Sequence, residues 1–280
     1  MEGATEAALM DVEPLVVNGR RIVSIRQINN LPPPQKEAVY RQLVPPEALL
    51  RFGIPLSLKD SEGHPLLTCV CEPGTCSVAL ALRHEWNAQD PVLYLEMADT
   101  SHNQLEVLLF VVNDPKSERF NVDRTPDGRP THFGTEARNI EEEIRAMQAG
   151  LAPGQVRRGA RLTRRLIPRF EAFVARLGHD RFHVQPLAYH TAILFERCGF
   201  AYVTGQGRME WIHQEFGSGG VLHRRLDGST PFRQPGAEAT VRGRSWAIHD
   251  GILGEPFTGV KMYKRVGIHA GICTFPNAAW

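Results

Sequence analysis

Residues 153–200 constrain the fold of this 280-residue chain more than any other stretch. They read as a turn, a basic amphipathic helix, a short strand, a second helix and the start of another strand. On the first helix, residues 157–177, apolar residues recur on one face and arginines fill the opposite face. Pro168 lies inside this pattern and predicts a kink or an interruption of the helix. A strand at residues 181–185 and a helix at 187–198 complete the stretch.

Four strands are predicted before this stretch. Three are short runs of apolar or β-branched residues bounded by turn residues, at 65–71, 77–83 and 92–97. The fourth, residues 104–112, is nearly continuous in apolar character, which favours a central strand covered on both faces. The four strands therefore form the predicted core of a sheet.

The other predicted elements have weaker signals. Asn18-Gly19 supplies the two positive-φ positions of a type I′ hairpin, and Asn139 is a good N-cap for the helix that follows it. Two short helices, a second hairpin and that capped helix are expected before the organising stretch: 35–43, 46–52, 119–135 and 140–149. Strand candidates after residue 199 lie at four places: 200–203, 208–216, 245–249 and 260–266.

The order of these elements resembles the GNAT acyltransferase superfamily. Helices come early, then consecutive strands, a strong strand, a helix that begins in an Arg/Gly turn, a short strand, and a helix ending in Gly-Phe. The resemblance covers about residues 66–216. It implies an α+β fold, with a GNAT-like mixed and mostly antiparallel sheet flanked by helices. It places the domain at 15–216 with an inserted hairpin and helix at about 114–154, between a loose N-terminal tail (1–14) and a C-terminal extension (217–280).

The resemblance also implies a cosubstrate. In that superfamily the turn before the long helix has the pattern Q/R-x-x-G-x-G/A and holds the pyrophosphate of acyl-CoA. Small residues let the backbone approach the phosphates, and the helix dipole favours anions. Acetyl-CoA or another acyl-CoA is therefore expected at the matching residues: Val156, Arg157, Arg158, Gly159, Ala160 and Arg161. Arg161 takes the second small position, where its side chain either obstructs the phosphate or binds it through the guanidinium.

Two residues are candidates for the catalytic base. Glu106 lies on a strand that in this superfamily faces the acceptor, and an unpaired charge within LEVLLF would be costly. An ion pair with an arginine is an equal alternative for Glu106. His190 is the second candidate because histidine titrates near neutrality, although a surface or capping role is the alternative for it and for three other histidines. Those three are His179, His183 and His213.

Two functions follow from the resemblance. The first is transfer of an acyl group from acyl-CoA to an amine on a small molecule or a protein. The second is a non-catalytic GNAT-like protein that binds or assembles. Arg161 favours the second, and so does Phe195, which stands where the superfamily usually has a tyrosine that protonates the departing CoA thiolate. Because a fold does not fix a function, the pattern of elements favours neither.

Charge and composition limit the other partners. The formal net charge is only +1, so no global field attracts nucleic acid or an anionic membrane. Aromatic residues do not interleave with the arginines as a nucleic-acid stacking platform requires. No apolar run is long enough to span a bilayer and the N-terminus does not resemble a signal peptide, so we expect a cytoplasmic protein. The C-terminal extension is a candidate surface for a protein partner.

The five cysteines do not predict a disulfide framework, because their number is odd and they are widely spread. Cys69, Cys71 and Cys76 form C-x-C-x4-C, which raises the alternative of a metal site. Their spacing is not that of a zinc knuckle. Alternation along a strand places Cys69 and Cys71 on the same face, where cysteine acts as a small hydrophobe. The sequence therefore predicts no metal.

Overall fold

The computed structural model describes residues 12–134 and 136–280. Most of the expected N-terminal tail, residues 1–14, lies outside the described residues. The chain divides into two compact units, and each is built from separate stretches. Of the described residues, 12–115, 159–185 and 263–269 form the first unit, and 116–134, 136–158, 186–262 and 270–280 form the second unit.

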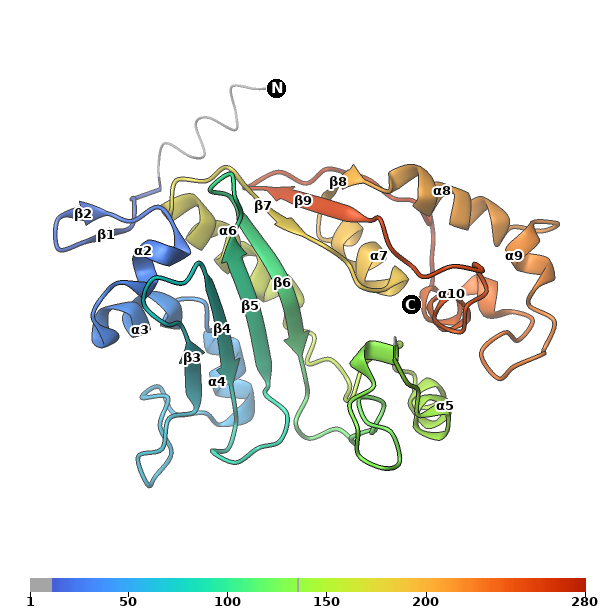
Figure 1. The fold of residues 1–280 in the computed structure, drawn as a ribbon, viewed down its shortest axis with the longest axis horizontal. Coiled ribbons are helices and arrows are strands. Elements are labelled where there is room, and N and C mark those ends of the chain that lie inside the picture. The colour runs from blue at the N-terminus through green and yellow to red at the C-terminus, as the bar shows by residue number, and fades with distance from the viewer. Residues whose placement is uncertain (1–11, 135) are drawn as a thin grey trace. The chain divides into compact units, whose positions relative to one another are not determined.

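The fold is mixed α+β, and its main sheet is mostly antiparallel. Its seven strands have the order β3-β4-β5-β6-β7-β9-β8 (Figure 1). Their bounds are β3 (Leu67–Val70), β4 (Ser77–Leu82), β5 (Leu93–Asp99), β6 (Leu105–Val112), β7 (Arg181–Val184), β8 (Ala201–Thr204) and β9 (Lys261–Arg265). The four strands predicted ahead of the organising stretch are confirmed as β3 to β6. The expected C-terminal extension supplies β9, which lies between β7 and β8 in the strand order.

Strands β3 to β6 form an antiparallel meander, and β6 pairs with β7 in parallel. The register between β5 and β6 shifts after Glu96, which pairs with Leu109, whereas Met97 pairs with Val107. Leu108 is the extra residue of this bulge, and its side chain is exposed. A bulge increases the local twist and bends its strand. The bulge directly follows Val107, the last residue of β6 that pairs with β7.

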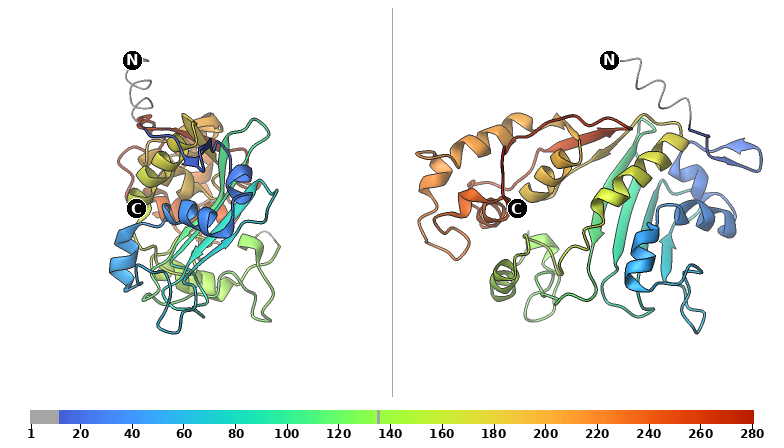
Figure 2. Two further views of the ribbon diagram at one scale, coloured as in Figure 1. Left: turned by 90° about the vertical axis from the view of Figure 1, so that its left-hand side faces the viewer. Right: turned by 180° about the vertical axis from the view of Figure 1, so that it is seen from behind.

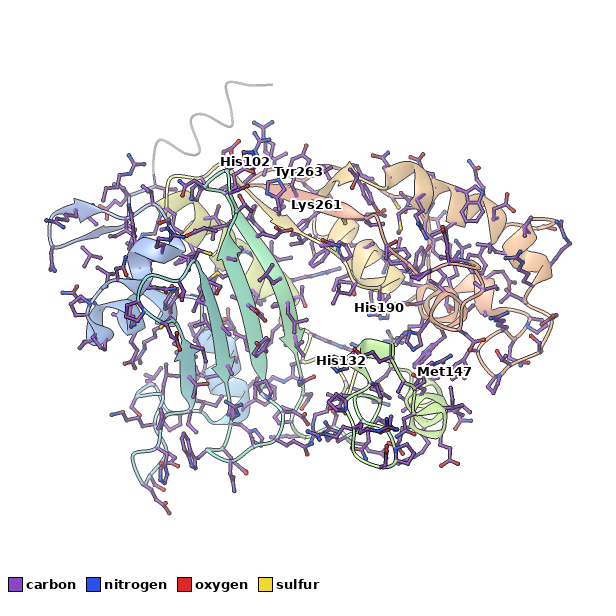
Figure 3. The ribbon with its side chains drawn as sticks, in the orientation of Figure 1. His102, His132, Met147, His190, Lys261 and Tyr263 are labelled. Carbon is purple, nitrogen blue, oxygen red and sulfur yellow. The ribbon has the colours of Figure 1, made fainter. Side chains whose placement is uncertain are left out.

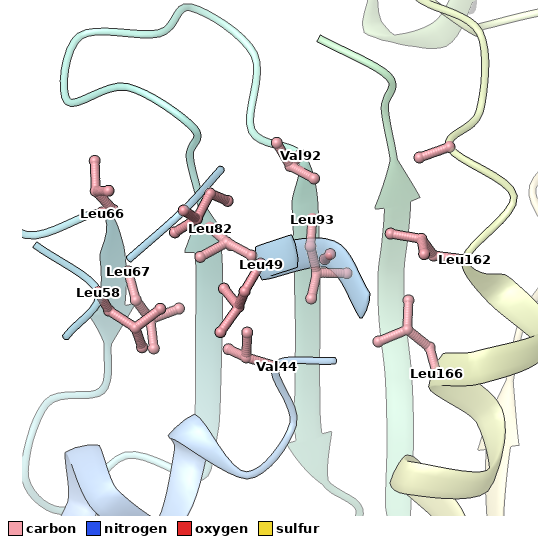
Figure 4. Close-up of a cluster of buried hydrophobic side chains, with 13 residues drawn as sticks. Val44, Leu49, Leu58, Leu66, Leu67, Leu82, Val92, Leu93, Leu162 and Leu166 are labelled. Atoms are coloured by element: carbon pink, nitrogen blue, oxygen red, sulfur yellow. The ribbon is translucent and has the colours of Figure 1, made fainter. Parts of the chain in front are cut away.

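The core of the first unit lies on one face of β3 to β6. Helices α4 (Pro46–Phe52) and α6 (Thr163–Arg176) lie against that face (Figure 2, right). Leu49 of α4 and Leu166 of α6 belong to the same buried cluster as Leu82 and Leu93 of the sheet (Figure 4). Burying one such side chain stabilises a fold by roughly 1.5–3 kcal/mol. The predicted apolar face of the long helix is thus confirmed as its packing face.

The N-terminal part of the first unit contains β1 (Val16–Val17), β2 (Arg20–Arg21), α2 (Ile25–Asn29) and α3 (Pro33–Arg41). The hairpin at Asn18-Gly19 is confirmed, because both residues have positive φ and β1 pairs with β2. The backbone N–H groups of Ile25 and Arg26 donate to the carboxylate of Asp99 at 2.8 and 2.9 Å. A strand carboxylate therefore fixes the start of α2 on the sheet.

The second unit is mainly helical. It contains α5 (Ile140–Gln148), α7 (Tyr189–Arg197), α8 (Gln206–Glu215), α9 (Val221–Arg224) and α10 (Val241–His249), with 3₁₀ turns η1 (His132–Gly134) and η2 (Ala237–Ala239). Its core includes Trp246, whose indole N–H donates to the carbonyl of Leu151 at 2.8 Å. Phe232 stacks on the Trp246 ring at 5.2 Å between centroids. The predicted cap of α5 is confirmed, because the Asn139 side chain accepts from the Glu142 N–H.

Several sequence predictions are wrong. Residues 208–216 were expected as a strand, but 208–215 lie in α8, where Met209 and Ile212 are buried and Trp211 is exposed, a helical spacing. Residues 245–249 likewise lie in α10. The hairpin expected at 119–135 is reduced to one isolated bridge, between Arg124 and Pro130. The long helix begins at Thr163 rather than near residue 157, and it continues through Pro168.

Candidate functional site

The candidate site of the first unit lies around a β-α-β crossover. Strands β6 and β7 are parallel, and α6 connects them in sequence. Their pairing covers only Leu105–Val107 against Phe182–Val184, after which β6 continues to Val112 while β7 ends. Ligands of parallel β-α-β units sit beyond the carboxyl ends of the strands, near the helix N-terminus. The crossover therefore leaves the β7 side of the second half of β6 without a strand partner within the described ranges.

The turn before α6 is fixed to the end of β6. The Arg51 guanidinium of α4 donates to the carbonyl of Ala160 and forms an ion pair with Asp114 at 2.8 Å. Asp114 follows β6 directly, so one arginine joins the strand end to the turn. A Cβ added to Gly159 would lie 3.6 Å from the carbonyl oxygen of Val112. The chain leaves this unit after residue 115 and returns at 159, yet the order of strand, turn and helix stays intact.

The six residues expected to bind the cosubstrate divide between the units. Gly159, Ala160 and Arg161 belong to the first unit, and Val156, Arg157 and Arg158 belong to the second. Ala160 is fully buried, whereas Arg161 is exposed with φ +56°. That left-handed conformation is one that glycine adopts most easily. Arg161 therefore adopts a backbone conformation that suits glycine, one of the two small residues that the pattern Q/R-x-x-G-x-G/A has at this position.

The three residues in the second unit have partners there. The Val156 carbonyl accepts from the Phe120 N–H at 2.8 Å. The Arg157 guanidinium donates to the Ser117 carbonyl, and that of Arg158 donates to the Ala149 carbonyl. These contacts fix the end of the inserted segment. Phosphate binding by Val156, Arg157 and Arg158 stays a prediction.

The first turn of α6 is strongly basic. Arg161, Arg164 and Arg165 are exposed, and the helix has no acidic residue in its first turn. Across the described ranges, these three guanidinium groups make no ion pair or side-chain hydrogen bond. A helix N-terminus carries partial positive charge, so cations there are unfavourable unless an anion is present. The sequence pattern placed Arg164 and Arg165 on the arginine-rich face of the long helix, but it did not identify them as residues of the first turn of that helix.

The sheet face opposite α6 carries ionisable side chains of β5, β6 and β7. No helix of this unit crosses in front of β5 and β6 among the described residues (Figure 1). Glu106 lies on this face because its neighbours Leu105 and Val107 are buried. The Tyr94 hydroxyl donates to Glu96 at 3.2 Å on the same face of β5. Burial and the Glu96 carboxylate together raise the pKa of Tyr94.

Glu106 has His183 as its register partner on β7. His183 is one of the four histidines for which the sequence leaves open both a catalytic base and a surface or capping role. Its place was readable from the alternation in Arg-Phe-His-Val, because Phe182 and Val184 are buried and His183 projects the other way. Tyr263 of β9, labelled in Figure 3, lies 6.4 Å from His183 between ring centroids.

His190 lies in the second unit, on α7 (Figure 3). Only 8% of the residue is exposed, and its Nδ1 lies 2.9 Å from the hydroxyl of Ser245 on α10. Burial lowers the pKa of His190 to about 4, and the nearby charges of Arg242 and His249 act in the same direction. The imidazole is therefore neutral near pH 7. A catalytic role for His190 stays a prediction.

The pKa of His190 makes the stability of the protein depend on pH. Because the folded-state value lies below the unfolded value of about 6.5, the unfolded chain binds a proton that the folded chain does not between these limits. Stabilisation is complete above pH 6.5 and is lost as pH falls toward 4. We expect urea unfolding to show a loss of about 3 kcal/mol from this group between pH 7 and 4. His190→Gln should lose that pH dependence and His102→Gln should keep it; equal pH profiles for His190→Gln and the wild type would contradict the assignment.

Phe195 is buried in α7 and packs on Phe200, with 4.8 Å between ring centroids. The next residue, Glu196, is also buried and accepts from the Thr274 hydroxyl at 2.6 Å and the Thr274 N–H at 2.9 Å. It accepts from the Tyr202 hydroxyl as well. Glu196 thus fixes the C-terminal segment to α7 at Thr274. The phenyl ring of Phe195 cannot donate a proton.

Two further properties concern metals and membranes. The cysteines Cys69, Cys71 and Cys76 are free thiols, and Cys69 packs beside the core of the first unit. Burial raises the pKa of Cys69 to about 12. No group of three or more His, Cys, Asp or Glu residues in the described ranges is arranged to hold a metal ion. In the same ranges, no helix has the length and apolar character needed to cross a bilayer.

Comparison with models of protein families, with curated proteins and with solved structures finds no match to this chain.

Proposed function

We propose that this chain is an acyl-CoA-dependent N-acyltransferase-like protein with a GNAT-like fold. The observation that carries the proposal is the parallel β6–β7 pair, which separates after three residues, together with the basic N-terminus of α6, whose preceding turn lies at the end of β6. The antiparallel run of β3 to β6, followed by α6, β7, α7 and β8, also supports it, because it accords with the order of elements in the resemblance. The location is proposed to be cytoplasmic, and a protein partner for residues 217–280 stays a prediction.

The chemistry of an acyl-CoA fits the residues at this crossover. Its phosphates would be held by the turn at Gly159 to Arg161 and by Arg164 and Arg165, because guanidinium groups form strong charge-assisted hydrogen bonds to phosphate. Its thioester arm is an amide-containing chain, which needs backbone partners. The unpartnered side of β6 beyond Val107 offers backbone N–H and C=O groups of that kind. Acetyl-CoA or a longer acyl-CoA would therefore be the cosubstrate.

The acceptor would meet the sheet face opposite α6. Glu106 lies there, beside the point where β6 and β7 separate, and it is proposed to take part in the deprotonation of an amine acceptor. A carboxylate on this face also attracts the ammonium form of an amine before transfer. The acceptor class is a primary amine, on a small molecule or on a protein.

The alternative is a non-catalytic GNAT-like protein that binds or assembles. Phe195 favours it, because the residue expected to protonate the CoA thiolate is replaced by a buried phenyl ring. Solvent protonates a thiolate near neutrality without help, since thiol pKa values are about 8.5. The loss of this group therefore slows transfer but does not abolish it, and acyl transfer remains the favoured proposal.

Turnover with a set of primary amines tests the proposal against this alternative. The full chain would be incubated with acetyl-CoA and benzylamine, spermidine, lysine amide or a lysine-containing peptide. Free CoA thiol and the N-acetylated product are expected in equal amounts, measured by thiol titration and mass spectrometry. Binding of acetyl-CoA without product from any amine would contradict transfer and favour the non-catalytic alternative.

The arginines at the start of α6 give a prediction on affinity. Replacing Arg164 and Arg165 together by glutamate should raise the Kd for acetyl-CoA at least about tenfold at low salt, because each charge-assisted hydrogen bond contributes roughly 1.5–3 kcal/mol. Isothermal titration calorimetry measures the effect. Replacing Arg20 and Arg21, both exposed in β2, by glutamate makes the same change in net charge and is the control. An unchanged Kd in the double variant would place the phosphates elsewhere.

A further inference from the structure

Glu106 and His183 are direct neighbours on the open face of the first unit. They are register partners in the parallel pair of β6 and β7. Adjacent strands lie about 4.8 Å apart, and partner side chains on one face project side by side. Both project away from α6, because Phe182, the residue before His183, packs on Phe170 of α6 with 4.7 Å between ring centroids. A carboxyl group and an imidazole therefore lie side by side on this face of the sheet.

The row continues onto β9. The Tyr263 ring lies 6.4 Å from the His183 ring, and the guanidinium carbon of Arg181 lies 5.8 Å from the centre of the Tyr263 ring. Met262 and Lys264 on either side of Tyr263 are buried, and Lys264 forms an ion pair at 3.4 Å with Glu171 of α6. Tyr263 therefore projects to the same face as His183. The charged and titratable groups on this face of the strands around His183 are Glu106 from β6, Arg181 from β7, and Lys261, Tyr263 and Arg265 from β9.

We propose that Glu106 and His183 act as one proton-accepting pair in acyl transfer, in which His183 takes the proton from the acceptor and Glu106 positions the imidazole. This inference rests on the proposed function. A histidine exchanges protons near neutral pH, whereas a carboxylate alone is a weak base toward an ammonium ion. A carboxylate beside it stabilises the imidazolium ion that forms. Neither residue alone supplies both properties.

Acyl transfer removes two protons from the nitrogen of the acceptor. The acceptor enters as an ammonium ion; one N–H bond breaks, its electron pair stays on nitrogen, and the proton moves to the imidazole of His183. The amine nitrogen then bonds to the thioester carbonyl carbon, and the C–S bond breaks with its electron pair on sulfur. The second nitrogen proton leaves to the thiolate through solvent. The products are an amide and CoA thiol, and His183 releases its proton to solvent.

His190 is not an equivalent candidate for this role. It lies on α7, and its ring faces the Ser245 hydroxyl inside the second unit. Burial keeps its imidazole neutral, and it has no carboxylate as a strand neighbour. Its replacement should change stability through packing, whereas replacement of His183 should change the pH dependence of turnover. The two histidines can therefore be distinguished by experiment.

Histidine side-chain NMR of the full chain tests the coupling directly, without any acceptor. Glu106→Gln removes the carboxylate that favours the imidazolium ion, so the titration midpoint of His183 should fall by about one pH unit. Glu62→Gln, an exposed carboxylate in a distant turn, should leave that midpoint unchanged. A midpoint that stays within about 0.2 pH units in Glu106→Gln would overturn the pair, whether or not the protein transfers acyl groups.

Kinetics with acetyl-CoA and the best amine of the set test the role. His183→Gln should lower kcat about 100-fold or more and remove the acidic limb of the pH profile, with the KM for acetyl-CoA unchanged. His102→Gln, an exposed histidine in the turn before β6, is the control and should keep both. An acidic limb that persists in His183→Gln would overturn the assignment. If the NMR titration shows that Glu106 and His183 are coupled but the wild-type protein acylates none of the amines, the proposed function is overturned. The role of the pair as a base is then overturned with it.

Discussion

Replacing Glu106 by glutamine is expected to lower kcat/KM for amine acylation about 100-fold or more. Glutamine keeps the size of the side chain but carries no negative charge, so it does not stabilise an imidazolium ion on His183. Removing a positioned acid–base group costs roughly 10²–10⁴-fold in rate. The measurement is steady-state release of CoA thiol at several amine concentrations.

The same variant should bind acetyl-CoA as tightly as the wild type. The proposed phosphate contacts lie at the start of α6, behind the sheet face that carries Glu106. Loss of turnover with intact binding therefore separates a role in chemistry from a role in folding. Glu62→Gln is the matched control, since it removes an exposed carboxylate from the segment between α4 and β3. Turnover of Glu106→Gln within threefold of wild type would remove Glu106 from the mechanism.

Replacing Glu143 by alanine should lower the free energy of unfolding by about 3–5 kcal/mol, the cost of leaving buried charges without a partner. Glu143 is 2% exposed in α5 and accepts from Arg138 at 2.9 Å. It also lies 3.2 Å from the Nε2 atom of His249 on α10. Arg138 in turn forms an ion pair with Asp250 at 2.9 Å. Urea unfolding followed by circular dichroism measures the effect.

The pKa of Glu143 gives the pH range of this stabilisation. Burial alone would raise its pKa, but hydrogen bonds and charge from His249 and Arg138 outweigh burial and hold the pKa below its usual range. The stabilisation is therefore complete above the unfolded value of about 4.3 and is lost as pH falls through the folded value. Glu143→Ala should consequently show its full effect at pH 7.

Two controls make the Glu143 result decisive. Glu141→Ala removes an exposed carboxylate from the same first turn and should cost less than about 0.5 kcal/mol. In the double variant Arg138→Ala, Glu143→Ala, the loss should be smaller than the sum of the single losses, because the two side chains share one network. A loss below about 1 kcal/mol for Glu143→Ala would show that the network does not stabilise the second unit.

Local patterns in the sequence predicted β3 to β6 and the apolar face of α6, because alternation, turn residues and helical spacing decide these elements. These local patterns gave a wrong prediction where strand alternation and helical spacing both fit the same residues. In Met-Glu-Trp-Ile-His-Gln-Glu-Phe, alternation suggested a strand, but Met209, Ile212 and Phe216 are buried at spacings of three and four, as a helix requires. Short mixed runs of this kind are decided by tertiary packing.

The candidate site was predictable only in part. Glu106 and the turn at Gly159 carry local signals, and both are found beside the β6–β7 crossover. The partnership of Glu106 with His183 depends on parallel pairing of strands about 75 residues apart, and no local pattern sets that register. The division of the expected phosphate turn between two units likewise follows from long-range packing.

Binding of acetyl-CoA, measured by isothermal titration calorimetry, tests the central claim most directly. We expect wild-type protein to bind one acetyl-CoA with a Kd in the range typical of enzyme substrates, about 1 μM to 1 mM. Gly159→Trp should weaken binding at least about 30-fold, because an indole would occupy the turn at the end of β6, where a Cβ meets only the Val112 carbonyl at 3.6 Å. Gly207→Trp, where a Cβ meets nothing within 4 Å, should bind as the wild type does. No binding by the wild type, or equal binding by both variants, would contradict an acyl-CoA site at this crossover.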